Sequence, residues 1–503
     1  LLATGCTDQL EDLSRVDQTR FRAEYAVPLI DSRVSLRDLI GDVTEELSVS
    51  VDPDGLLRFR YSGEVPAVGS DVIFARLETI AEGIFLPITQ RRQAAPFAGP
   101  NDIDLDEVRI KGGLLSYVFP NPYEEPVRIT LRIPDATLNG EPFSVAAEVP
   151  AYSGSGDFPV FANPDAPVNL AGYVLTLPED SLYFEYDIED LAGNDLPVAD
   201  RSVVTITNLR FSYVEGYLGS EFYPGGRDTI AVDFFENYQG GEIFFQNPTV
   251  TMTLINSFGL PARALVDVLN VKDVNGNVIP ITGTAVESGF DFDFPTVPGD
   301  TAQTVFVFDR TNSNIDEVLS ARPVALDYEV NALINPDGNT GVTGFLTDTS
   351  AYRARVDVEL PLYGNARDFQ VLDTFPINLL DAYEDVVSAT FRLTTKNGLP
   401  LDLDLSGTFL DSLGNPVADL TNAGEVSLLR SSAVDAAGNP TGTETVTNDF
   451  LFAEERLAAL RTANRLVIEI AVSTTDGGTP FVRVADDQEL TVLLGAIVEV
   501  VRD

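Results

Sequence analysis

The chain has 503 residues, of which 78 are acidic and 32 basic, so its formal net charge is -46. A surface of this charge repels phosphates and excludes nucleic acid as a partner, and the length exceeds what one hydrophobic core usually supports. The chain has no histidine or tryptophan and only one cysteine, Cys6, which excludes histidine-based catalysis, an intramolecular disulfide and a zinc site of cysteine and histidine.

The amino terminus joins apolar and small residues to that single cysteine. Residues 1–6 read Leu-Leu-Ala-Thr-Gly-Cys, which resembles a bacterial lipobox at the end of a signal peptide. The resemblance implies that Cys6 carries lipid and anchors an exported protein in the outer membrane or at the cell surface. Residues 7–23 are polar and charged, as expected of a flexible tether. The alternative is a chance run of small residues beside a free or buried cysteine.

Residues 24–90 differ in pattern from the rest of the chain. The segment 24–41 predicts a strand and then a short helix, and the segment 47–63 predicts a hairpin that turns at Asp54-Gly55. We therefore expect a small N-terminal β module over residues 24–90.

The remaining sequence repeats one pattern three times: a strand, a loop with an asparagine and a proline, a second strand and a glycine turn. The loop prolines recur 135 and 139 residues apart, and the turn glycines recur 136 and 138 residues apart. Two independent landmarks with one period predict three β-sandwich repeats, at residues 91–223, 224–365 and 366–503. The landmarks are Asn121, Pro126 and Gly140; Asn256, Pro261 and Gly276; and Asn397, Pro400 and Gly414.

The second and third repeats also agree in their later halves. Residues 314–321 and 454–463 each predict a short helix, and each leads into an alternating strand, at 324–332 and 465–472. The expected fold class is all-β: tandem immunoglobulin-like antiparallel sandwiches in an elongated chain with a few short helices.

A family resemblance is carried by the strand pair around residues 256–261, Asn-Ser-Phe-Gly-Leu-Pro, and by the turn of Gly276 and Asn277. These features resemble the immunoglobulin-like sandwiches of the late-embryogenesis-abundant type 2 family. With the lipobox and the three repeats, the chain resembles large lipoproteins of Bacteroidota. These families imply a structural or binding role and no catalytic residues.

Two groups of side chains are candidates for ligand binding. Asp102, Asp104 and Asp106 alternate, so a strand would present all three on one face as calcium ligands, or simply as a solvated acidic face. Asp291 with Asp293 and Asp402 with Asp404 alternate in the same way. The aromatic residues between the first two repeats form either an exposed ligand surface or a packed joint: Tyr213, Tyr217, Phe222 and Tyr223.

These features favour a lipid-anchored surface protein that acts as a structural, adhesive or binding scaffold without catalysis or a cofactor. Its expected partners are the membrane, through Cys6, and a surface glycan or protein. One alternative is a self-assembling subunit of a filament or surface layer, since exposed sheet edges can polymerise by strand addition. The other is a carbohydrate-binding module or glycosidase accessory.

Overall fold

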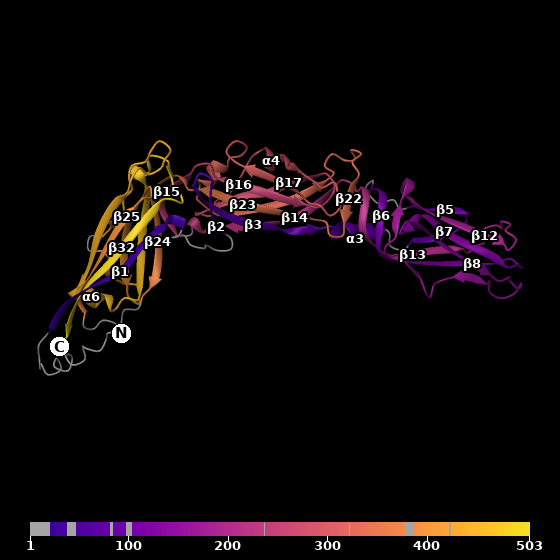
Figure 1. Ribbon diagram of the computed structural model, residues 1–503, viewed down its shortest axis with the longest axis horizontal. Coiled ribbons are helices and arrows are strands. Elements are labelled where there is room, and N and C mark those ends of the chain that lie inside the picture. Colours follow the sequence, from indigo (N-terminus) through magenta and orange to yellow (C-terminus); the bar gives the residue numbers. More distant parts are fainter. Residues whose placement is uncertain are drawn as a thin grey trace, which may run out of the picture.

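The computed structural model describes residues 21–37, 47–80, 84–96, 103–235, 237–320, 322–377, 386–421 and 424–502. Antiparallel sheets form three sandwiches that follow one another along an elongated, bent molecule (Figure 1). This confirms the all-β fold class. None of the helices in these ranges has the length and hydropathy needed to cross a lipid bilayer.

The first sandwich lies at one end of the molecule. Strands β6 and β13 pair in one half and β7, β8 and β12 in the other, and β11 pairs with both β6 and β7, so that all of them belong to one sheet. Its strands are β4 (Ile84–Pro87), β5 (Arg92–Pro96), β6 (Asp104–Pro120), β7 (Val127–Leu138), β8 (Glu141–Val149), β9 (Val160–Ala162), β10 (Val168–Asn169), β11 (Val174–Thr176), β12 (Ser181–Asp190) and β13 (Val203–Tyr217).

The second sandwich occupies the middle and consists of two sheets. One has the order β2 (Leu47–Val51), β3 (Leu57–Gly69), β23 (Ala351–Pro361), β16 (Thr249–Asn256), β20 (Ala302–Phe308). The other has the order β14 (Glu221–Ala231), β21 (Pro323–Ile334), β17 (Ala262–Asp273), β18 (Val278–Pro280), with β19 (Phe290–Phe292) beside β17. Strand β22 (Gly344–Thr347) leaves this sandwich and pairs with β13 of the first.

The third sandwich again has two sheets. The first, called sheet A below, has the order β1 (Phe21–Ser35), β32 (Glu489–Arg502), β25 (Val386–Asn397), β29 (Glu444–Ala453). The second, called sheet F, has the order β15 (Tyr238–Phe245), β24 (Tyr363–Pro376), β30 (Arg465–Thr474), β26 (Leu401–Leu410), β27 (Pro416–Asp419), with β28 (Val426–Leu429) on β26 and β31 (Val482–Arg483) on β24.

The described helices are short. They are α3 (Asp71–Ile80), α4 (Thr284–Ser288), α5 (Ile315–Leu319), α6 (Glu454–Leu460), α7 (Thr475–Gly478) and the 3₁₀ turns η1 (Pro178–Asp180) and η2 (Asp233–Phe235). Helices α5 and α6, with the strands β21 and β30 that follow them, confirm the elements expected in the later halves of the second and third repeats. The sequence analysis missed α3, which lies at the joint of the first two sandwiches (Figure 1).

The segment 24–90 does not form the separate module that we expected. Its strands are divided among the three sandwiches: β1 belongs to the third, β2 and β3 to the second, and β4 to the first. Strand β1 pairs with β32 from Phe21 opposite Arg502 to Ser35 opposite Glu489. Backbone N–H and C=O groups at the edge of a sheet need hydrogen-bond partners. In each sandwich a strand from this segment supplies some of these partners. The two described ends of the chain therefore lie side by side (Figure 1).

Each sandwich has a buried asparagine where the chain turns from one strand to the next. The Asn397 amide donates to the carbonyls of Leu399, Leu401 and Arg430 at 2.8–3.1 Å, and its oxygen accepts from the Leu399 N–H at 2.9 Å. Asn121 and Asn256 bond in the same way, to the N–H groups of Tyr123 and Phe258 and to the carbonyls of Pro150 and Asp293. The asparagine landmarks of the sequence thus occupy corresponding places in the three sandwiches.

A second local motif closes four hairpin turns of the form Asp-x-x-Gly-Asn. In the turn of Asp411, its carboxylate accepts from the N–H groups of Leu413 and Asn415 and from the Asn415 side chain at 2.8–3.1 Å. Gly414 has a φ of 88°, a conformation that glycine adopts without strain. The hydrogen bonds from Asn415 hold the pKa of Asp411 below its ordinary value. The equivalent aspartates are Asp190, Asp273 and Asp435, whose pKa values the same kind of bonding lowers.

The core is distributed unevenly. One continuous cluster of buried apolar side chains fills the first two sandwiches and includes Phe119, Tyr186, Met252 and Tyr328, all at most 1% exposed. The same cluster reaches the third sandwich only at Phe245, Ala366 and Phe369 of sheet F. Its other buried apolar residues form two smaller clusters, one around Leu399, which includes Leu57 of β3, and the other around Phe409 and Phe452. The third sandwich is therefore less densely filled than the other two.

Candidate functional site

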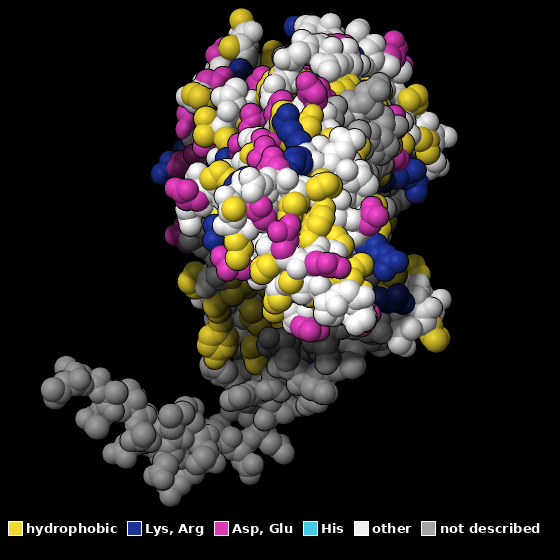
Figure 2. Space-filling view, turned by 90° about the vertical axis from the view of Figure 1, so that its right-hand side faces the viewer, with side chains coloured by type: hydrophobic (Ala, Val, Ile, Leu, Met, Phe, Trp, Pro, Cys, Tyr) yellow, Lys and Arg dark blue, Asp and Glu magenta, His cyan; other side chains and the backbone are white. Residues whose placement is uncertain are grey.

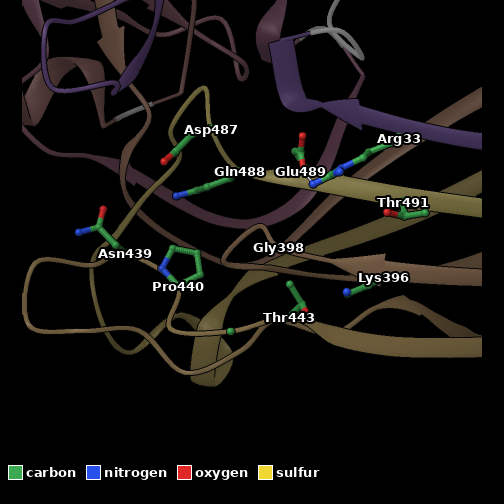
Figure 3. A pocket seen from close by; sticks show the side chains of 11 residues that line it. Arg33, Lys396, Gly398, Asn439, Pro440, Thr443, Asp487, Gln488, Glu489 and Thr491 are labelled. Carbon is green, nitrogen blue, oxygen red and sulfur yellow. Dashed lines mark ion pairs between the residues drawn. The ribbon is translucent and has the colours of Figure 1, made fainter.

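A polar pocket of about 510 Å³ opens in the third sandwich, close to the second (Figure 3). Its centre is a row across three neighbouring strands, because Thr491 of β32 lies opposite both Arg33 of β1 and Lys396 of β25. Adjacent strands are about 4.8 Å apart, which separates the two basic residues by roughly 10 Å. The pocket thus brings together residues that are hundreds of positions apart in the sequence.

The charges in this pocket are mixed. Arg33 forms an ion pair with Glu489, drawn in Figure 3. Lys396 and Asp487 also line the pocket, and neither has an ion-pair partner among the residues that the structure describes. This ammonium and this carboxylate, without ion-pair partners in the described part of the chain, suit a ligand with both hydrogen-bond acceptors and donors.

Two hydrogen-bonded loops hold the walls in place. Gln488 is buried, and its amide nitrogen donates to the Arg483 carbonyl at 2.9 Å, which fixes the loop that leads into β32. Asn439, on the facing wall, donates its backbone N–H to the Asp435 carboxylate at 2.9 Å in the last of the four turns described above. Because both loops are fixed without a ligand, the pocket is largely preformed.

The predicted calcium ligands are only partly visible. Asp104 and Asp106 are both exposed on one face of β6, as the alternation predicted, whereas Asp102 lies outside the described residues. Partial burial, and then the charges of Asp104 and Glu215, raise the pKa of Asp106. Within the described part of the chain, no three acidic or cysteine side chains are grouped closely enough to hold a metal ion. The calcium site of all three aspartates remains a prediction.

Three of the other alternating acids, Asp291, Asp402 and Asp404, bind nearby residues of their own sandwich. Asp291 pairs with Arg263 at 2.7 Å, and Asp404 pairs with Arg430 at 3.0 Å. Asp402 accepts a hydrogen bond from the Ser431 backbone at 2.7 Å. These carboxylates are therefore engaged as structural partners.

The four aromatic candidates do not lie on one surface. Tyr213 and Tyr223 are buried, Tyr217 is half-buried, and Phe222 is 50% exposed. The Tyr213 ring stacks on Phe345 of β22, with centroids 6.2 Å apart and planes at 19°, so it packs the joint between the first two sandwiches. Its hydroxyl donates to the Glu215 carboxylate, and burial together with this bond raises the pKa of Tyr213.

Cys6 lies outside the described residues, so its lipidation stays a prediction. The polar pocket was missed by sequence reasoning, because its walls come from β1, β25 and β32. One signal could have pointed to it: Lys396 is one of only three lysines in this acidic chain.

Comparisons with known proteins identify no family. No family model and no curated protein matched the sequence. Among solved structures, a presumed secreted protein from Parabacteroides distasonis is 12% identical, with a TM-score of 0.24, over 94% of this chain and 99% of that one. A structure of infectious bursal disease virus, Gt strain, is 10% identical over 97% and 83%, with a TM-score of 0.15. The PBSX exported protein XepA is 11% identical over 63% and 99%, with a TM-score of 0.12. Scores this low support no conclusion about this chain.

Proposed function

We propose that this chain is an exported, lipid-anchored surface scaffold without catalytic activity, whose first sandwich is held away from the membrane. The observation that carries the proposal is the position of the two described ends, which lie together at the pole of the third sandwich (Figure 1). Cys6 precedes Phe21 by 15 residues, a tether that spans at most about 54 Å when fully extended. A lipid on Cys6 would therefore hold this pole near the membrane and leave the first sandwich at the far end.

The joints between sandwiches suit a stalk that resists bending. At the outer joint, β22 of the second sandwich extends the sheet of the first by pairing with β13. At the inner joint, β15 comes from the chain segment between two strands of the second sandwich, yet it pairs with β24 in the third. Strand exchange of this kind replaces a flexible linker with sheet hydrogen bonds.

The exposed far end is suited to solvent rather than to a membrane. Acidic, basic and apolar side chains lie next to one another over this end of the molecule, and the acidic ones are spread over it (Figure 2). With the net charge of -46, such a surface keeps copies of the chain apart in solution.

The test combines an anchor variant with a reporter at the far end. An epitope inserted between Gly154 and Gly156, in an exposed loop of the first sandwich, should be labelled by antibody on intact cells that export the protein. Cys6→Ser should abolish incorporation of labelled fatty acid and move the protein from the membrane fraction to the soluble fraction. Unchanged membrane partition of Cys6→Ser, or no labelling of intact cells, would refute the proposal.

The polar pocket favours glycan binding as a second candidate function. The row of Arg33, Thr491 and Lys396 places two basic side chains in one pocket of an acidic protein, which suits a saccharide bearing a carboxylate or sulfate. A glycan array should show binding of acidic saccharides that Lys396→Met removes. Lys272→Met is the matched control, because Lys272 is exposed on β17, outside the pocket. An array without binding, or equal effects of the two variants, would exclude this function.

A further inference from the structure

The third sandwich encloses an apolar cavity of about 610 Å³ between its two sheets. Of the 15 described residues that line it, fourteen are aliphatic or aromatic, and the remaining one is Arg461. The contrast with the first sandwich is large, since the space between Ile110, Ile133 and Leu209 there amounts to about 10 Å³. Sandwiches of one chain thus differ sharply in how far side chains fill the interior.

Aromatic side chains keep this space from closing. Phe452 of sheet A meets Phe391 edge-on, with ring centroids 5.9 Å apart and planes at 77°. It meets Phe409 of sheet F at 6.3 Å and 79°, so one ring bridges the two sheets. Leu457 and Leu460 of α6 add to the wall. These groups hold the sheets apart at the pole where the chain ends lie.

The cavity communicates with solvent at the edge strand β1. Val27 and Leu29 line the cavity, yet they are 43% and 48% exposed. Apolar side chains around an unfilled space lack van der Waals contacts and are still exposed to water. An apolar occupant would supply those contacts and displace the water, so it would stabilise this sandwich. An entrance at an edge strand allows an elongated molecule to enter end first.

We propose that the cavity binds one long acyl chain with an anionic head group, as in a fatty acid. An engineered cavity of about 150 Å³ is large enough to hold benzene. The present cavity is about four times larger and therefore has room for a long chain. The head group follows from Arg461, the one charged side chain among the described residues that line the cavity. Its exposed guanidinium has five N–H donors in a planar fork, so it can bind a carboxylate in addition to a partner within the protein.

Binding is measured on the full chain with Cys6→Ser, so that no lipid of its own is present. Octanoate, decanoate and dodecanoate are titrated by calorimetry. Each added methylene should tighten binding about fourfold, the change that corresponds to about 0.8 kcal/mol. Arg461→Gln should weaken binding of decanoate but leave decanol unchanged, and Arg465→Gln, outside the lining residues, should change neither. Affinity independent of chain length, or equal effects of the two arginine variants, would overturn the proposal.

The location is tested with two substitutions on one strand. Ala496 of β32 lines the cavity, whereas Ile497 is 49% exposed on the opposite face. Ala496→Phe should fill the cavity and weaken binding at least tenfold, while Ile497→Phe should bind like the parent chain, with thermal unfolding showing that both are folded. Decanoate binding that survives Ala496→Phe would overturn the site.

A measurement on the unsubstituted cavity covers the case in which Ala496→Phe does not fold. A photoreactive fatty acid should label peptides from β25, β29, α6 and β32, and excess decanoate should suppress the labelling. Labels confined to other elements would overturn the proposal. It would also be overturned if no fatty acid bound and the chain instead formed a dimer that Ala496→Phe dissociates, because a second copy of the chain would then cover the cavity. Because the chain carries Cys6→Ser, either outcome leaves the proposed membrane anchor untouched.

Discussion

The buried asparagines make the sharpest prediction about stability. Asn397 is fully buried, and Asn397→Ala removes the acceptor of the Leu399 N–H and the donor to three carbonyls. Alanine cannot replace these bonds, and Leu399 is itself 2% exposed, so water does not reach its N–H without local opening. The substitution therefore acts on hydrogen bonding at the corner between β25 and β26.

The magnitude follows from the groups left without partners. A buried donor or acceptor that loses its partner costs about 1–3 kcal/mol. Counting only the Leu399 N–H and one of the three carbonyls, we expect a loss of about 2–6 kcal/mol in the free energy of local unfolding. The control Asn464→Ala changes an exposed asparagine in the same sandwich, and it should cost no more than about 0.5 kcal/mol.

The measurement must distinguish the sandwiches, since a chain of this size does not unfold in one step. Native-state hydrogen–deuterium exchange with peptide resolution gives an opening free energy for each strand. Asn397→Ala should lower it in β25 and β26 and leave β6 and β7 unchanged, and Asn121→Ala should do the reverse. If Asn397→Ala costs no more than Asn464→Ala, the amide does not hold the corner and the reasoning fails.

Three further predictions concern acid stability, the outer joint and the edge strand. The pKa values of Asp411 and Asp435 are lowered by folding, so their stabilisation is complete above the unfolded value of about 3.9 and is lost as the pH falls through the lower folded values. The urea midpoint of the transition that unfolds the third sandwich should therefore decline below about pH 4, and less steeply for Asp411→Asn. Gly259→Ala places a Cβ 2.1 Å from the Phe345 ring, so amide exchange should accelerate in β22 and not at the inner joint. Deleting residues 1–35 uncovers the β32 edge, and size-exclusion chromatography should show concentration-dependent association.

The parts of the fold that could be predicted from sequence depend on local interactions. At the corner of Asn256 the side chain accepts from the N–H of Phe258, two residues away, and the turn of Gly276 closes on the carbonyl of Asp273. The helix at 454–460 has its own short pattern. The asparagine corner and the glycine turn recur in each repeat because the same residues meet the same backbone geometry wherever they occur. This is why a pattern with one period correctly located corresponding places in three sandwiches.

The placement of the N-terminal strand could not be predicted in this way. The alternation of Tyr25, Val27 and Leu29 is compatible with any half-exposed edge, and nothing nearby in sequence identifies β32 as the partner. A strand of this pattern could pair with many sheet edges. The pairing of residue 21 with residue 502 depends on which sandwich lacks an edge strand, which local sequence does not reveal. The pocket of Arg33 and Lys396 depends on that choice, so it was hidden for the same reason.

The uneven core is consistent with different roles for the three sandwiches. The first two sandwiches share one continuous cluster of buried side chains, so a disturbance in either is resisted by both. The third has smaller clusters, an apolar cavity open at an edge strand, the polar pocket and both described ends of the chain. A protein that must hold a rigid body away from a surface needs stiffness at the far end, whereas ligand entry needs space and a mobile edge. Under the two proposals above, a loosely filled sandwich at the pole of the chain ends would satisfy both requirements, because a ligand that filled the cavity would stiffen the base without altering the far end.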